Sequence, residues 1–141
     1  MEMMRTSAQS GESLRRRYDP AAWSTDYWGK PIAAMLELIV YLEEVIDFPP
    51  QSVSTSHEDL VFSAPDDHRR WVRVHPLGKD HGGPAGARFQ IRHPIEAPWS
   101  HAIGYADDVE QAWRLIRNAL PTPQHEACQA GGGRARVRAS D

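Results

Sequence analysis

Three short segments in the middle of the chain alternate apolar and polar residues, which is the period of a β-strand with one buried face. They cover residues 58–63, 70–75 and 88–92. Turn-forming residues separate them: Pro65-Asp66-Asp67 after the first, and a stretch from Pro76 to Gly86 with four glycines and two prolines after the second. Because consecutive strands with short connections usually pair antiparallel, these segments predict an antiparallel sheet.

A helix is predicted on each side of these strands. The first follows Pro31, which suits a first helical turn, and Pro49-Pro50 ends it. Its apolar residues recur at spacings of three and four: Ile32, Met35, Leu36, Ile39, Leu42 and Ile46. The second begins near Asp107, where Glu110 completes a capping-box spacing, and Pro121 stops it. Its apolar positions are Val109, Ala112, Trp113, Ile116 and Leu120.

The order of these segments predicts an α+β fold: a helix, a three- to four-stranded antiparallel sheet and a closing helix, with both helices on one face. The fourth strand is the weaker segment 101–105. Residues 22–121 form the expected single domain. Residues 1–21 are predicted to be a disordered or loosely attached arm, and residues 122–141 a disordered Gly/Arg tail, because both stretches lack an apolar period.

Composition limits the classes of partner and compartment. A chain of 141 residues fits one domain, and a net charge of -3 is too small to indicate a nucleic acid or a membrane surface. Residues 1–17 lack the apolar core of a signal peptide, and the apolar stretch 32–46 contains three glutamates. The single cysteine, Cys128, cannot form an intrachain disulfide. We therefore expect a cytoplasmic protein without membrane contact.

No motif for catalysis or metal binding stands out. The seven histidines lack the spacing of known ligand sets, so no metal is expected. A G-x-S-x-G nucleophile elbow is absent, and Cys128 has no organised base nearby. The glycine-rich segment Gly82–Gly86 lacks the lysine of a phosphate-binding loop. We expect no catalytic residue and no cofactor, although an enzyme of unrecognised type stays an alternative.

The strand alternation also predicts which side chains point away from the helices. If Val72, Val74, Phe89 and Ile91 face the core, their neighbours face outward. These neighbours are Trp71, Arg73, His75, Arg88, Gln90 and Arg92. Arg and Trp are enriched in binding hot spots, so this face is a candidate interaction surface. A plain solvated sheet face is the simpler interpretation.

A second candidate surface is the aromatic segment that contains Trp23, Tyr27 and Trp28, which either covers the core or binds a partner. The sequence thus favours a small non-catalytic binding or adaptor module that recognises a protein, a second copy of itself included. The alternative is a nucleic-acid-binding domain that uses the same arginines with the basic tail residues Arg134, Arg136 and Arg138. The acidic balance of the chain speaks against that alternative.

The strand and helix segments also support a family resemblance. Asp59-Leu60-Val61-Phe62 precedes Arg70-Trp71-Val72-Arg73-Val74, and His101-Ala102-Ile103 later runs into Asp107-Asp108-Val109 and the closing helix. Over residues 32–120 this order resembles the small MmcQ/YjbR-like and related YdhG-like α+β domains. The resemblance implies binding to DNA or proteins, as suspected for some members, and no catalytic residue.

Overall fold

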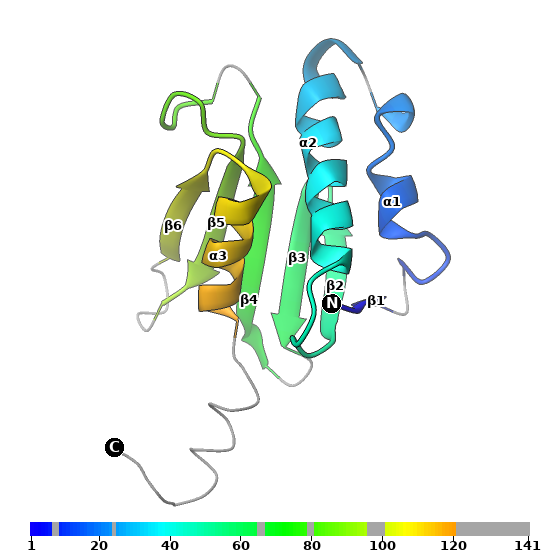
Figure 1. The fold of residues 1–141 in the computed structure, drawn as a ribbon, viewed down its shortest axis with the longest axis vertical. Helices are drawn as coiled ribbons and strands as arrows, with labels where there is room; N and C mark the ends of the chain where they lie inside the picture. The colour runs from blue at the N-terminus through cyan, green and yellow to red at the C-terminus, as the bar shows by residue number, and fades with distance from the viewer. Residues whose placement is uncertain (7–8, 24, 65–66, 79–80, 96–100, 121–141) are drawn as a thin grey trace, which may run out of the picture.

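The computed structural model describes residues 1–6, 9–23, 25–64, 67–78, 81–95 and 101–120 (Figure 1). Its elements are β1 (Met3–Arg5), α1 (Leu14–Arg17), η2 (Pro20–Ala22), α2 (Thr25–Glu43), β2 (Gln51–Ser56), β3 (Asp59–Ala64), β4 (Asp67–Pro76), β5 (Phe89–Pro94), β6 (His101–Ala106) and α3 (Val109–Ala119). The predicted tail, residues 122–141, lies outside the described residues.

The strands form one sheet in chain order, from β1 to β6. β2 to β6 pair antiparallel with their neighbours, whereas β1 runs parallel to β2. The α+β class is confirmed, but three to four strands is an undercount, because the described residues contain six. The four predicted segments correspond to β3–β6. β2 was missed because its sequence, QSVSTS, has a single large apolar residue, Val53.

Helices α2 and α3 lie on the same side of this sheet (Figure 1). The strand residues facing them are buried, and they include Val53, Leu60, Phe62, Val72, Val74, Phe89 and Ile91. From α2 the core receives Ile32, Met35, Leu38, Ile39 and Leu42, and from α3 it receives Ala112, Trp113 and Ile116. The predicted inward orientation of the apolar positions in β4 and β5 is therefore confirmed.

The first long helix begins earlier and ends earlier than its apolar period predicts. α2 starts at Thr25 and thus contains Tyr27 and Trp28, while Pro31 lies inside it. Pro31 has no N–H and cannot donate to the Tyr27 carbonyl, four residues before it. Because α2 ends at Glu43, Ile46 does not reach the core and is 80% exposed. Among the described helices, none is both long enough and apolar enough to span a bilayer.

The start of α3 is shifted by one residue from the predicted cap. Asp108, rather than Asp107, is the N-cap, and its carboxylate accepts a hydrogen bond from the Gln111 N–H at 2.8 Å. The Gln111 side chain in turn accepts from the Asp107 N–H at 3.0 Å. The capping interaction is thus made by Asp108 with Gln111, in place of Asp107 with Glu110.

The N-terminal residues form part of the folded unit, which corrects the expectation of a loosely attached arm over residues 1–21. Met3–Arg5 pairs with β2, and Leu14 and Tyr18 are buried in the core. The Tyr18 hydroxyl donates to the Glu58 carbonyl at 3.2 Å, and burial raises the pKa of Tyr18. One short strand and two apolar residues four positions apart are too few to show a period in a polar sequence.

Candidate functional site

The outer face of the sheet, meaning the side opposite α2 and α3, carries most of the predicted site residues. In the strand register Arg73 lies opposite Arg92, and Arg92 lies opposite Ile103. A parallel row places His75 opposite Gln90, and Gln90 opposite Tyr105. The structure therefore brings Arg73, His75, Gln90 and Arg92 together on neighbouring strands. Trp71 adds an aromatic ring whose centroid lies 5.3 Å from that of His101.

The buried carboxylate of Asp59, at the start of β3, contacts two of these side chains. Asp59 is 7% exposed, and its Oδ2 lies 3.2 Å from Nη1 of Arg73. Its Oδ1 lies 2.6 Å from Nδ1 of His75. The hydrogen bond to Asp59 raises the pKa of His75, an effect that burial opposes and the charges of Asp59 and Glu58 reinforce. The charge of Arg73 is consequently compensated within the chain.

Arg92 differs from Arg73 because it has no such compensation. It makes no hydrogen bond or ion pair with another residue in the described part of the chain, and its buried Nε lacks a partner. Nε itself is closed to solvent, so a ligand at the surface would accept from the Nη groups of this half-buried side chain. Arg92 is thus the uncompensated cation of this surface, between the neutralised Arg73 and the exposed Ile103.

A hollow of about 470 Å³ opens beside Arg92. Its lining includes Glu58, Asp59, Arg73, His75, Gln90 and Arg92. Next to it, β6 presents Ile103 at 52% exposure and Tyr105 at 36%, and the Tyr105 hydroxyl accepts from Gln90 Nε2 at 3.3 Å. The described residues of this surface therefore combine one unpaired cation with exposed apolar side chains, which suits a ligand that has both a carboxylate and an apolar group.

Arg88, which was predicted to join this face, lies elsewhere. Its Nη2 contacts Oε1 of Glu37 on α2 at 2.7 Å, and its guanidinium lies 5.7 Å from the centroid of the Phe89 ring. Arg88 precedes β5, which begins at Phe89, so the alternation of the strand does not determine its direction. It is thus on the helix side of the sheet, with its charge paired.

The aromatic segment mostly covers the core. Trp23 and Trp28 pack against the core, and the Trp23 indole N–H donates to the Arg17 carbonyl at 2.9 Å. Tyr27 stays 47% exposed and contacts Trp28 edge to face, with the ring centroids 4.8 Å apart. These three residues therefore do not extend the outer face.

Sequence reasoning did not find the group formed by Glu58, Asp59 and His75, whose donor atoms lie within 4.8 Å of one another. Carboxylates with an imidazole can hold a metal ion. In this structure both Asp59 oxygens already bind Arg73 and His75, so a cation would have to displace the Arg73 guanidinium. The sequence signal that could have indicated this group is the charged residue Asp59 at the start of an otherwise apolar strand.

Comparison with known proteins adds no further guide. No family model, no curated protein and no solved structure matches this chain. Function is therefore inferred from the contacts, charges and burial of the described residues.

Proposed function

We propose that this chain is a non-catalytic binding module that recognises a protein partner through the outer face of β4–β6. The observation that carries the proposal is the uncompensated guanidinium of Arg92 beside a hollow on that face. A partner carboxylate would form a charge-assisted, bidentate pair with Arg92. The partner thereby pairs with a guanidinium that no described residue compensates, which gives binding a defined centre.

The surroundings of Arg92 favour a protein as the source of that carboxylate. Ile103 and Tyr105 offer exposed apolar area directly beside it, and Trp71 adds an aromatic ring on the same face. An arginine surrounded by aromatic and aliphatic residues is the composition of a protein-binding hot spot. The expected partner segment places an Asp or Glu next to an apolar side chain, so that Arg92 and Ile103 are covered together.

The nucleic-acid alternative has less support from the same contacts. It needs several cations on one face, yet Asp59 compensates Arg73 and Glu37 holds Arg88 on the helix side. An enzyme of unrecognised type has one supporting contact, between His75 and Asp59. Within the described part of the chain, however, His75 forms no hydrogen bond to a hydroxyl or thiol that it could activate.

Site-specific photo-crosslinking tests this proposal in cells that express the chain naturally. Benzoylphenylalanine at Ile103 should crosslink one protein, whereas the same group at Ile46, which is exposed outside the sheet, should not. The purified partner is then titrated against variants. Arg92→Ala should weaken binding by at least about 10-fold, and Arg117→Ala, on the exposed side of α3, by less than about 2-fold.

Two outcomes would contradict the proposal. The first is a crosslinked product at Ile103 that nuclease rather than protease removes, which would identify a nucleic acid. The second is a protein partner whose affinity is the same for the native chain and Arg92→Ala.

A further inference from the structure

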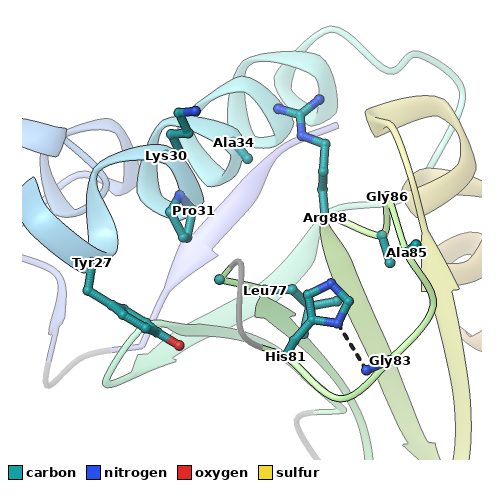
Figure 2. Close-up of a pocket in the computed structure, with 12 residues that line it drawn as sticks. Tyr27, Lys30, Pro31, Ala34, Leu77, His81, Gly83, Ala85, Gly86 and Arg88 are labelled. Carbon is teal, nitrogen blue, oxygen red and sulfur yellow. Dashed lines mark hydrogen bonds between the residues drawn. The ribbon is translucent and has the colours of Figure 1, made fainter.

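A second hollow lies on the helix side of the sheet, between α2 and the connection from β4 to β5 (Figure 2). Its volume of about 870 Å³ is within the range of about 300–1,000 Å³ that is typical of small-molecule sites. Neither the predicted binding face nor the residues around Arg92 include its walls on α2. It shares Leu77 and His81 with the hollow beside Arg92, but its α2 wall belongs to this hollow and Arg92 to the other.

The walls of this hollow are largely apolar. Pro31 and Ala34 come from α2, and Leu77 and Ala85 come from the connection on the other side (Figure 2). The ring of Tyr27 closes one end. Small and apolar side chains thus form much of the wall around a space large enough for a ring system.

The connection is built around the Tyr27 ring. A Cβ atom at Gly78 would lie 2.8 Å from the Tyr27 hydroxyl oxygen, so a side chain at this position would displace the Tyr27 ring from its present place. Gly86 has a φ of +85°, which also favours glycine. Trp28 contacts Tyr27 from the other side. The Tyr27 ring thus lies between Gly78 on the connection and Trp28 on α2.

The polar groups of the hollow indicate the charge of its ligand. The Gly83 N–H donates to Nδ1 of His81 at 3.0 Å, so in the neutral ring Nε2 carries the proton and is a donor (Figure 2). Lys30 is exposed and pairs with no other described residue, whereas the charge of Arg88 is compensated by Glu37. Among the described residues that line the hollow, one positive charge and one fixed donor thus remain available to an anionic group.

We propose that this hollow binds a small aromatic compound with a single carboxylate. The ring of the ligand would lie against Tyr27, Pro31 and Leu77, because these residues supply its aromatic and aliphatic walls. Its carboxylate would accept from the Lys30 ammonium at the rim of the hollow, while His81 lies on the opposite wall (Figure 2). The proposal does not rest on the protein-binding surface, because Tyr27, Pro31 and Lys30 line this hollow and not the one beside Arg92, although both hollows include His81.

A titration of the isotope-labelled full chain, followed by amide NMR, tests this site with 2-naphthoate and its neutral match 2-naphthamide. We expect saturable shifts at the amides of Gly78, Gly83 and Gly86, and an affinity for the acid at least about 5-fold above that for the amide. Lys30→Gln, at an exposed position, should reduce this preference to less than about 2-fold without changing the dispersion of the spectrum.

Steric block provides the second arm of the test. Ala85 is exposed on the rim, so Ala85→Trp should fill the hollow and abolish the shifts, whereas Ala33→Trp, exposed on α2 outside the lining, should leave them unchanged. Absence of saturable shifts, equal affinity for acid and amide, or shifts centred on Gln90 and Arg92 would overturn the proposal.

Discussion

The imidazole Nδ1 of His75 lies 2.6 Å from Oδ1 of Asp59, the charged residue that the described part of the chain buries. The contact joins β3 to β4 on the outer face of the sheet. Asp59 also binds Arg73, so a single carboxylate determines the charge of two neighbouring side chains. Its removal should therefore change both the stability and the electrostatics of this face.

We expect the stabilising effect of His75 to depend on pH. The hydrogen bond to Asp59 raises the pKa of His75 above its ordinary value of 6.5, so the folded chain holds this proton more tightly than the unfolded chain. The stabilisation is then complete below about pH 6.5 and is lost as the pH rises through the folded pKa. Urea unfolding of the native chain and His75→Gln should show a larger difference in unfolding free energy at about pH 6 than at about pH 9. If the difference in unfolding free energy increases with pH, a charged pair of protonated His75 with Asp59 is excluded as the source of the stabilisation.

A second prediction tests the anchoring of the N-terminal residues. Tyr18 is fully buried, so Tyr18→Ala should lower the free energy of unfolding by about 3–5 kcal/mol. Tyr18→Phe removes the hydroxyl that donates to the Glu58 carbonyl and should cost about 1 kcal/mol. Chemical denaturation of both variants measures these costs. Losses below about 0.5 kcal/mol for both would support the loosely attached arm instead.

A third prediction compares two neighbouring positions on opposite faces of β4. Val72 is 2% exposed, so Val72→Asp places an uncompensated charge in the core and should cost more than about 4 kcal/mol. Trp71 lies on the outer face against His101, and Trp71→Ala should cost about 1 kcal/mol. Thermal unfolding of the two variants gives the comparison. A tolerated Val72→Asp together with a collapsed Trp71→Ala would mean that the faces are reversed.

The sequence predicts those parts of the fold whose signal is local. The alternation in β4 and β5 correctly assigned Val72, Val74, Phe89 and Ile91 to the core, since a strand has a strict two-residue period. β1 was not predicted because Met3–Arg5 is too short to show a period, and β2 was not predicted because Val53 is its single large apolar residue. Arg88 was predicted on the wrong face of the sheet because it lies one position before β5, where the alternation does not apply.

The candidate site depends on contacts that no local pattern contains. Asp59 is 14 residues from Arg73 and 16 from His75, and the register of β3 with β4 brings them together. The sequence therefore predicted an arginine-rich face without showing which arginine is compensated. The distance from Asp59 to Arg73 shows that Arg73 is paired, and among the described residues Arg92 has no such partner.

The last prediction separates a protein-binding face from a nucleic-acid-binding face through salt dependence. Each cation that contacts a phosphate changes the slope of log K against log salt by about −0.9. Because Asp59 compensates Arg73, Arg73→Gln should leave the slope for a DNA duplex unchanged, as measured by fluorescence anisotropy with the full chain. Asp59→Asn frees Arg73 and should steepen the slope by about 1. Asp107→Asn makes the same change in net charge at an exposed position without a paired arginine, and it should have no such effect. The basic tail contributes equally to all these chains, so the differences report on the outer face alone. A slope that becomes shallower by about 1 in Arg73→Gln would instead show that the native face already holds phosphates.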